Sequence, residues 1–593
     1  MNQDGAPVNS TKTNFSIMLH VAVISLAGLL IYSNTLTTVF QFDDKLNIVD
    51  NPFIRNLGNL WPPSGARWFG YLTFALNYAV GGLNPLGYHL INLFIHIFTA
   101  LAVYLLVLLT FRTPYCANHR DRVISGDRIA LACALLFVVH PIQTQAITYI
   151  VQRFASLAAL LFILSIDFYI LARLSFLSRS AGKNGSQWKA ALLFAASGIF
   201  AVLSLKTKEN AYTLPVVAVL FEVMFISGLS PVIAAIRNRW RIVAGTSAGI
   251  IVSLLILSSR YDLASLFESF KATNEISRHD YLITQFRVII TYIRLLFLPV
   301  GQSIDHHYPV YQNLFTPQII ASVALIAVLT ALAVYLYHVS RQGTPYARLI
   351  SFGIFWFFIT LSIESSVIPI IDVMFEHRLY LPSIGAILAV IAACAAGLER
   401  VRFTTRETAS RTAACILIIV TVTLACAAYA RNRVWKNELT LWKDVIAKTP
   451  ANPRGYNMVG SYYQAHFRVL DAISYYRKAL EVDSFYAEAR SNLGNAYLQI
   501  GRLDEGLNEL LMTERTHRFD AVDTGILYYN IGKAYFMKGM PDLAIEKLKL
   551  ALLINPNEAA VHNLFGQVYQ SRHLDAQSAA SFQRAHELNP DKF

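Results

Sequence analysis

Long apolar runs are the feature that most constrains this chain. They recur between residues 15 and 430 with few charged residues inside them, and a helix needs about 20 mostly apolar residues to cross a membrane. The whole chain is 55% hydrophobic and only 15% charged, which excludes a soluble enzyme and a disordered chain. We therefore predict a short N-terminal segment at 1–14, a membrane region at 15–430 and a soluble domain at 431–593.

Eleven of the apolar runs are predicted to cross the membrane as helices. The run 281–300 is not among them, because it contains Arg287 and Arg294, and a charge at the bilayer centre costs at least about 2.5 kcal/mol. We expect it to be an interfacial or re-entrant helix within an outer loop at 259–316. The predicted spans are 15–35, 86–110, 128–141, 146–172, 188–204, 210–228, 242–258, 317–338, 349–368, 380–397 and 412–430.

Basic residues set the predicted orientation. With eleven spans, the Arg- and Lys-bearing segments 112–128, 173–189 and 237–241 fall on the same side as Arg348 and the arginines of 400–411. Positively charged loops stay in the cytoplasm. The N-terminus is therefore expected to be cytoplasmic and the soluble domain to be outside the cytoplasm. The net charge of +13 is explained by these loops, and no concentrated basic face suggests nucleic-acid binding.

The soluble domain carries an internal repeat. Four glycines, Gly460, Gly494, Gly532 and Gly566, are 34, 38 and 34 residues apart, and each is followed by Tyr at the third position. A period of 34 residues is typical of tetratricopeptide repeats, which stack pairs of helices into a solenoid. We predict about four repeats, with four inserted residues in Thr513–Asp520. Such arrays usually bind peptides or proteins on a concave face, and the alternative is a solubilising appendage.

Polar residues gather on the predicted outer side of the membrane region. Because such residues are costly near membrane spans, they call for a reason. Asp43 and Asp44 lie in the first outer loop, 36–67. The other candidates are Arg67, His89 with Asn92 and His96 on one helix face, His140, Arg153, Lys206, Lys208, Glu209, Asp305, His306, His307, Glu376, His377 and Arg378. This arrangement predicts a site at the outer boundary between membrane and water.

Two adjacent carboxylates beside many cations suit transfer of a group from a phosphate-linked donor. A carboxylate can accept the proton of an attacking hydroxyl, and cations can neutralise a phosphate leaving group. Each residue also has a structural interpretation. The paired aspartates could cap a turn, the histidines could be packing residues, the lysines could reach toward headgroups, and Arg378 could pair with Glu376. A nucleotide donor is not expected, because no Gly-rich phosphate loop is present.

Several segments resemble one known family: FDDKLNIVDNP, RWFGYLTFALNYAVGGLNPLGYHLINLFIHI, HPIQTQAITYIVQRFASLAALLF, LKTKENAYTLP, PVGQSIDHHYPV and EHRLYLPSIG. Over essentially its whole length the chain resembles bacterial relatives of the transmembrane and tetratricopeptide repeat-containing O-mannosyltransferases. These are all-α integral-membrane glycosyltransferases of the GT-C class. One departure is Gln145, where relatives often carry an acidic residue.

The resemblance implies transfer of a sugar, such as a single mannose, from a polyprenyl- or dolichyl-phosphate donor to Ser or Thr of exported proteins. It assigns catalysis to Asp43 and Asp44. The donor phosphate would be held by Arg378, with His377, Lys206, Lys208 and Arg153 as further candidates. Some members use a divalent metal and others do not, and the repeats would present the acceptor protein.

Two other function classes stay open. One is a lipid-linked oligosaccharide ligase or polymerase, which would differ in its product. The other is a membrane scaffold without enzymatic activity, which would keep its function after loss of the aspartates. The expected location is a bacterial inner membrane with the repeats in the periplasm, and the alternative is an endoplasmic reticulum membrane with lumenal repeats.

Overall fold

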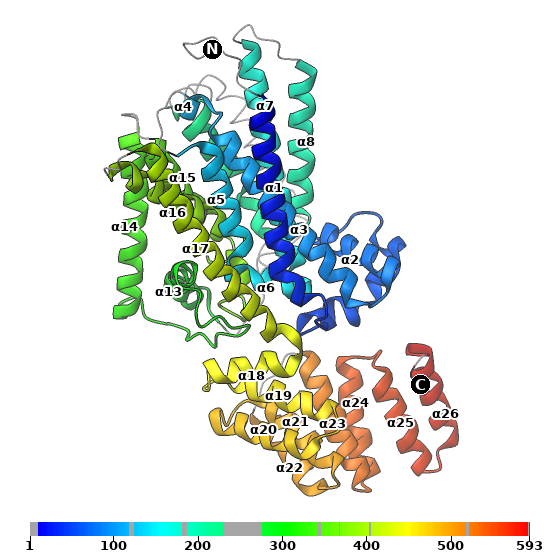
Figure 1. Cartoon of the computed structure of the whole chain (residues 1–593). Coiled ribbons are helices and arrows are strands. Elements are labelled where there is room, and N and C mark those ends of the chain that lie inside the picture. Colours follow the sequence, from blue (N-terminus) through cyan, green and yellow to red (C-terminus); the bar gives the residue numbers. More distant parts are fainter. Residues whose placement is uncertain are drawn as a thin grey trace, which may run out of the picture. The chain divides into compact units, whose positions relative to one another are not determined.

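The computed structural model describes residues 10–117, 124–180, 187–229, 276–340, 345–366, 368–401, 405–516, 521–590 and 592. Within this part of the chain every regular element is a helix. The molecule divides into two compact units, a membrane unit that ends at Asn437 and a repeat unit that begins at Glu438 (Figure 1). The all-α fold expected from the sequence is confirmed.

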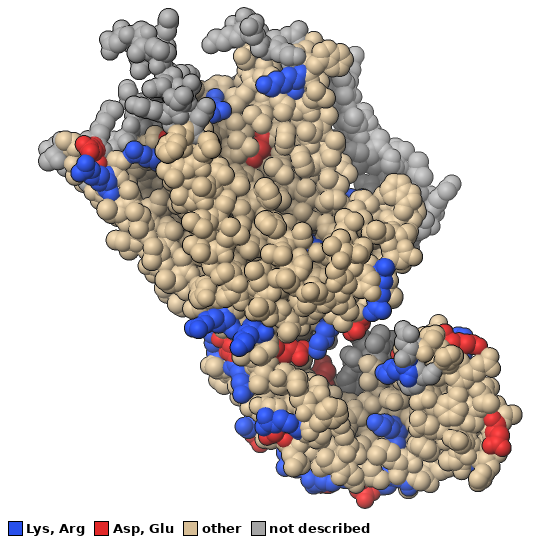
Figure 2. Space-filling view, turned by 45° about the vertical axis from the view of Figure 1, so that its right-hand side comes forward, with Lys and Arg blue, Asp and Glu red and all other residues tan. Residues whose placement is uncertain are grey.

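The long apolar helices of the membrane unit run side by side (Figure 1). Figure 2 shows charged side chains near the two ends of this unit, with a broad band between them that carries few charges. The helices are α1 (Ser10–Tyr32), α3 (Pro85–Thr110), α5 (Gly126–Val139), α7 (Arg153–Ser180), α8 (Gln187–Leu205), α9 (Leu214–Phe221), α14 (Pro317–Val339), α15 (Pro345–Leu361), α16 (Pro382–Arg400) and α17 (Arg406–Asn432).

These helices account for every predicted span in the described residues. Eight helices are long and apolar enough to cross a membrane, and α5 with the helical segment Pro141–Thr148 forms a further pair bent by 51°. The apolar helix α15 is shorter, with 17 residues. The predicted span 242–258 lies outside the described residues. The chain is a multi-pass membrane protein.

Two predicted boundaries differ from the structure. The helix expected at 146–172 begins only at Arg153, because Tyr149 has an extended backbone that separates it from α6 (Thr144–Thr148). The helix expected at 349–368 ends at Leu361, where the polar sequence Ser362–Ser366 begins. The irregular segment between α5 and α7 starts at Pro141, since proline has no N–H to donate and keeps the preceding His140 extended.

The run 281–300, which was not expected to span the membrane, forms α13 (Arg278–Phe297). Figure 1 shows it end-on, across the direction of the long helices. One face is buried through Tyr281, Val288 and Tyr292, while Arg294 is exposed and bonds the Val300 carbonyl. An amphipathic helix with this orientation agrees with the interpretation that it does not span.

A helix that the sequence analysis did not predict lies between the first outer loop, 36–67, and the second predicted span. After short turns at Pro52–Arg55 and Leu57–Leu60, α2 (Trp68–Gly81) forms and ends at Gly82, which has a positive φ of 58°. At the start of the same loop, the Asn34 side chain donates to the Tyr429 carbonyl, and the Asn432 side chain donates to Asn34 and to the Ile31 carbonyl. The last span is thereby fixed to the first.

The helices α15 and α16 approach each other closely. Gly353 and Gly385 face each other, and a Cβ added to Gly385 would lie 2.6 Å from the Gly353 carbonyl oxygen. The Trp356 side chain crosses the same contact and donates to the Leu381 carbonyl at 3.0 Å. Small residues let membrane helices approach in this way. The contact holds α16, and therefore the turn that precedes it, against the rest of the bundle.

The repeat unit consists of one leading helix and four helix pairs. A Cβ on any of the four repeat glycines would lie 2.6–2.9 Å from a side chain of the second helix of its pair, so glycine is needed for the helices to meet. The helices are α18 (Glu438–Lys448), α19 (Pro453–Ala465) with α20 (Val469–Val482), α21 (Ala487–Gln499) with α22 (Leu503–Thr516), α23 (Ala521–Met537) with α24 (Pro541–Ile554), and α25 (Ala559–Ser571) with α26 (Asp575–Leu588).

The longer second interval, from Gly494 to Gly532, has a structural explanation. The second helices α20, α22, α24 and α26 all have 14 residues, whereas α23 has 17 residues and the other first helices have 13. The four extra residues therefore lie at the start of α23, from Ala521 on, immediately after the segment Thr513–Asp520 that was expected to contain them. Residues 517–520 are outside the described part.

The contact between α15 and α16 generates a first prediction. Gly385→Ala should destabilise the protein by about 1–3 kcal/mol, because the backbones must move apart to accept the methyl group. Gly397→Ala is the matched control on the same helix, since a Cβ there meets open space. The measurement is the midpoint of thermal denaturation in detergent. Equal midpoints for the two variants would contradict the role assigned to this contact.

Candidate functional site

The candidate site is built around the irregular segment between α5 and α7, residues 140–152. The labels α2, α6 and α13 all lie at one end of the membrane unit in Figure 1, opposite α4 (Pro114–Ala117). Backbone groups that are buried away from water need hydrogen-bond partners. Many of the side chains predicted as site residues are these hydrogen-bond partners. Each predicted residue can therefore have a structural role or a chemical role.

Asp44 fixes the first outer loop to this segment. Its carboxylate accepts the Gln41 N–H at 3.0 Å and the Val151 N–H at 2.7 Å, and it is only 1% exposed. Burial raises the pKa of Asp44 to about 7, and the neighbouring Asp43 charge adds to this rise, while the hydrogen bonds oppose it. Both carboxylate oxygens are therefore engaged with backbone.

Asp43 has a different environment. It is half-buried rather than buried, and its backbone N–H donates to the Tyr149 hydroxyl oxygen at 2.9 Å. The Tyr149 hydroxyl also hydrogen-bonds the Asp43 side chain. The Tyr149 ring is fixed by Trp435, with ring centroids 5.5 Å apart. The two aspartates are thus adjacent in sequence but differ in exposure and in what they bind.

The predicted histidines of the spans are held by the protein. His89 Nε2 contacts the Thr38 hydroxyl at 2.7 Å, and His96 contacts the Tyr380 hydroxyl and the Val138 carbonyl. His140 accepts the Ile142 N–H and contacts the Leu296 carbonyl at 3.0 Å, which joins the end of α5 to the end of α13. These contacts favour the packing interpretation for His89 and His140.

Arg153 is completely buried at the start of α7. Its Nε donates to the Asn92 side chain at 2.7 Å, Nη1 to the Asn77 side chain at 2.6 Å, and Nη2 to the Tyr88 carbonyl at 3.0 Å. Its guanidinium carbon lies 4.5 Å from the centre of the Phe74 ring. Each nitrogen already has a protein acceptor, so the geometry favours a pin between α2, α3 and α7 over a phosphate ligand.

The loop after α8 separates its two lysines. Lys206 is exposed, whereas Lys208 is buried and forms an ion pair of 2.6 Å with Glu364. Glu209 accepts two hydrogen bonds from Arg67, at 3.0 and 3.2 Å, on a more exposed surface. The loop therefore brings together cations and carboxylates from three separate segments of the chain.

The turn before α16, Glu376–Leu379, carries three predicted residues, all of them buried. Glu376 does not pair with Arg378. It accepts the Gln302 side chain, the Ser303 N–H and His306 Nε2, at 2.9, 2.7 and 3.0 Å. Burial acts to raise the pKa of Glu376, but the hydrogen bond and charge of His306, the charge of Arg431 and the Ser303 N–H together outweigh it, so that the pKa lies below its ordinary value.

Arg378 donates to the Asp372 and Val373 carbonyls at 2.8 and 3.0 Å, beside the Tyr281 hydroxyl. His377 donates its backbone N–H to the Gln145 side chain at 2.8 Å, while its ring Nδ1 is buried without a hydrogen-bond partner among the described residues. Burial first, and then the charges of Lys208, Arg378 and Arg67, lower the pKa of His377 well below its usual value.

The loop after α13 supports this turn. Asp305 accepts the His307 N–H at 3.0 Å, which closes a local turn around a positive φ of 40° at His307. His306 reaches Glu376, so Asp305 and His306 belong to the scaffold of the turn rather than to an open surface.

The short helix α6 joins the acidic and basic halves of the site. Gln145 contacts the backbone of His377, and Tyr149, four residues later at the end of α6, contacts Asp43. One short segment of five residues therefore contacts both His377 and Asp43. Segments from the first loop, from α6 and from residues 376–378 thus meet at one end of the bundle.

Sequence analysis missed several residues of this arrangement. Tyr149 and Glu364 directly contact predicted site residues, and Tyr281 and Tyr292 line the Arg378 side. An aromatic residue in an apolar sequence carries no signal of its own, whereas Glu364, a charged residue within the predicted span 349–368, was a signal that could have found it. Among the described residues, no three His, Cys, Asp or Glu side chains are grouped as a metal ion would require.

Comparison with known proteins identifies the repeat and the relatives of the whole chain. A family model described as "Tetratricopeptide repeat" matches residues 526–558, most of α23 and α24. Protein O-mannosyl-transferase Tmtc3 of Drosophila melanogaster is 22% identical over 89% of this chain and 61% of its own length. Protein O-mannosyl-transferase TMTC3 of Homo sapiens is 22% identical over 89% of this chain and 57% of its own length.

Shorter matches also occur. Protein O-mannosyl-transferase Tmtc2 of Drosophila melanogaster is 32% identical over 33% of this chain and 20% of its own length. The crystal structure of MamA has 25% sequence identity and a TM-score of 0.23, and the match covers 26% of this chain and 88% of that chain. The chain spans about 60% of the length of the curated relatives that match most of it. It is a membrane-embedded relative of the TMTC proteins with a tetratricopeptide repeat array.

Proposed function

We propose that this chain is a membrane glycosyltransferase that moves a single hexose, such as mannose, from a polyprenyl-phosphate donor to Ser or Thr of exported proteins. The observation that carries the proposal is the bridge made by residues 145–149, which contact both Asp43 and the Glu376–Arg378 turn. The names of the relatives supply the reaction class. A general base and a cation cluster are the two parts that transfer from a lipid phosphate requires.

Asp43 is the proposed base. Its side chain is partly accessible, and the buried Tyr149 orients it. Asp44 is the proposed positioning residue, because both of its oxygens accept backbone N–H groups and leave it no geometry for a substrate hydroxyl. This division gives different tasks to the two carboxylates that the sequence alone could not distinguish.

Three cations, Arg67, Lys208 and Arg378, surround the proposed phosphate position. The carboxylates among them are Glu209 and Glu364, so the group keeps a net positive charge. His377 stays neutral beside these cations and offers its unpartnered ring nitrogen as a further hydrogen-bonding group. Such a cluster attracts an anion and stabilises the charge that develops on a leaving phosphate.

The proposed reaction is a single displacement. The acceptor oxygen forms a bond to the anomeric carbon while its proton passes to the Asp43 carboxylate. The bond from the anomeric carbon to the phosphate oxygen breaks, and its electron pair leaves with the lipid phosphate. Attack from the side opposite the phosphate inverts the configuration at the anomeric carbon. The atoms and charges of this step balance with only the donor, the acceptor hydroxyl and the Asp43 carboxylate.

The proposed location is the outer face of a bacterial inner membrane, with the repeat array in the periplasm. The support is the distribution of Lys and Arg among the loops, which favours a cytoplasmic N-terminus. The array would hold the acceptor protein near the membrane and raise its effective concentration.

Asp43→Asn should lower sugar transfer by about 100-fold or more, since an amide cannot accept the proton. The matched control is Asp50→Asn, an exposed aspartate in the same loop, which should keep full activity. Transfer is measured in membranes with a radiolabelled lipid-phosphate sugar, and intact-mass analysis of the acceptor shows whether one hexose was added. Full activity of Asp43→Asn would reject Asp43 as the base.

Asp44→Asn should change how stability depends on pH. In the folded protein the carboxyl keeps its proton up to about pH 7, whereas in the unfolded chain it loses it near pH 4. The folded state therefore binds more protons between about pH 4 and pH 7, and stability falls as pH rises through this window, by up to about 1.4 kcal/mol per pH unit. Denaturation midpoints across this range should show a smaller fall for the variant. Parallel curves would contradict the buried, protonated state.

Lys208→Gln should raise the KM for the donor about tenfold, because a buried charge near the phosphate is lost. Lys206→Gln is the control, since Lys206 is exposed two residues away. The single variant leaves the Glu364 carboxylate buried without its ion-pair partner. The double variant Lys208→Gln with Glu364→Gln removes this carboxylate, so it should recover stability without recovering the donor KM. A double variant with a normal KM would assign Lys208 a purely structural role.

A further inference from the structure

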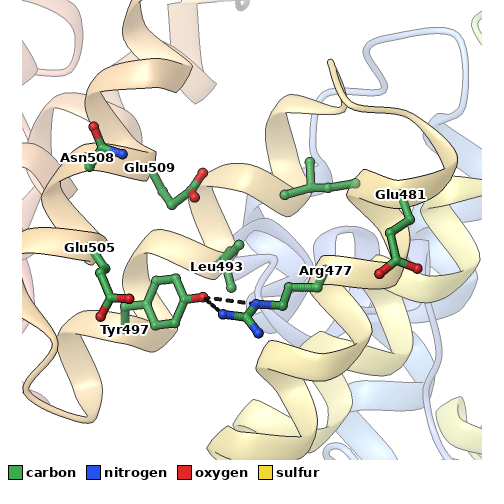
Figure 3. A pocket seen from close by; sticks show the side chains of 8 residues that line it. Arg477, Glu481, Leu493, Tyr497, Glu505, Asn508 and Glu509 are labelled. Atoms are coloured by element: carbon green, nitrogen blue, oxygen red, sulfur yellow. Dashed lines mark hydrogen bonds between the residues drawn. The ribbon is translucent and has the colours of Figure 1, made fainter.

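A groove opens on the repeat unit between two consecutive second helices. Its walls come from α20 and α22, its floor comes from α21, and its volume is about 520 Å³. Figure 3 shows the Tyr497 and Leu493 side chains at the floor, with charged side chains along both walls. The lining residues are Arg477, Leu480, Glu481, Leu493, Tyr497, Glu505, Asn508 and Glu509.

The groups in this groove differ in how they are already bound. Arg477 donates from Nε and Nη2 to the Tyr497 hydroxyl, at 3.0 and 2.6 Å, which leaves its Nη1 edge open. Glu509 pairs with Arg490 at 2.9 Å, and Glu505 pairs with Arg502. Glu481 and Asn508 are exposed and have no hydrogen bond or ion pair within the described structure. The groove therefore offers a free carboxylate and a free amide above an aromatic floor.

The other joints of the array show which of these groups the repeat needs. Tyr497 recurs at the same repeat position as Tyr463, Tyr535 and Tyr569, so an aromatic floor is part of the repeat. The three carboxylates do not recur. At the next joint, Arg515, Leu543 and Lys547 stand in place of Glu481, Glu505 and Glu509, and at the last joint the residues are Leu553, Gln577 and Ser581.

The carboxylates of this joint are thus not required for stacking the repeats. Their negative charge is opposite in sign to the net charge of +13 on the whole chain. A carboxylate without a partner, next to amide and guanidinium donors, is complementary to a backbone that carries a cationic side chain. Asn508 and the Nη1 edge of Arg477 suit peptide carbonyls, and Glu481 suits an ammonium or guanidinium group.

We propose that the groove between α20 and α22 binds an extended polypeptide segment that carries a Lys or Arg side chain. This deepens the proposed function by giving the array a partner of defined charge. The binding itself does not require sugar transfer, so the two can fail separately. A loss of transfer in Asp43→Asn leaves this inference intact, and a loss of peptide binding leaves the transfer chemistry intact.

The test uses the full-length chain in a nonionic detergent and two short fluorescein-labelled peptides of Gly, Ser and Ala. One peptide carries a pair of Lys, and the other carries Glu at the same positions. Fluorescence anisotropy should give at least about tenfold tighter binding of the Lys peptide, and binding should weaken as salt is added, as for exposed charges. Non-specific attraction would favour the Glu peptide instead, because the protein is basic.

Glu481→Gln should weaken binding of the Lys peptide about threefold, and Glu481→Lys about tenfold. The matched control is Glu546→Gln, which removes an exposed glutamate from the second helix of the third repeat, outside the groove, and should bind as the unchanged chain does. Circular dichroism checks that each variant stays helical. Equal binding of the two peptides, no binding of either, or normal binding by folded Glu481→Lys would each overturn the inference.

Discussion

The break in the helix after Val139 is the constraint on which the membrane unit depends. Proline at 141 ends α5, and residues 140–152 then run as short turns between two spans. In a membrane protein such backbone is tolerated only where other groups satisfy it. Here side chains from distant segments do so. Asp44 accepts the Val151 N–H, Asn92 donates to the Ile147 and Ile150 carbonyls, Gln302 donates to the Pro141 carbonyl, and His140 accepts the Ile142 N–H.

This requirement explains why polar residues gather at one end of the bundle without all of them being chemical. Arg153 holds Asn92 in place, and Glu376 is saturated by Gln302, Ser303 and His306. Removing one partner of a buried polar group costs the full desolvation of the other, so these residues would be indispensable even if none touched a substrate. The groups that we propose for chemistry are Asp43, the cations near Glu364, and the ring of His377.

The repeat array is held together by one kind of contact. Each glycine at the centre of a first helix admits a side chain of the second helix, and this contact repeats in all four pairs. The residues that vary between joints are on the surface of the second helices. That separation allows one joint to become acidic without cost to stacking, and it lets a binding surface change independently of the fold.

The sequence by itself determined the architecture of this protein. Apolar run length fixes helices that must cross a bilayer, and the 34-residue period fixes paired helices around each glycine, because both signals act through neighbouring residues. It also predicted Asp43, Lys208 and Arg378 as site residues. Only the tertiary structure distinguished their surroundings from those of their neighbours. Asp43 and Asp44 are the same residue type at adjacent positions. Asp44, however, is buried and accepts two backbone N–H groups, so it anchors the loop. Lys206 and Lys208 differ because Glu364, more than 150 residues away in the chain, meets only one of them. Such long-range pairing has no local pattern, since it arises from which helices lie together.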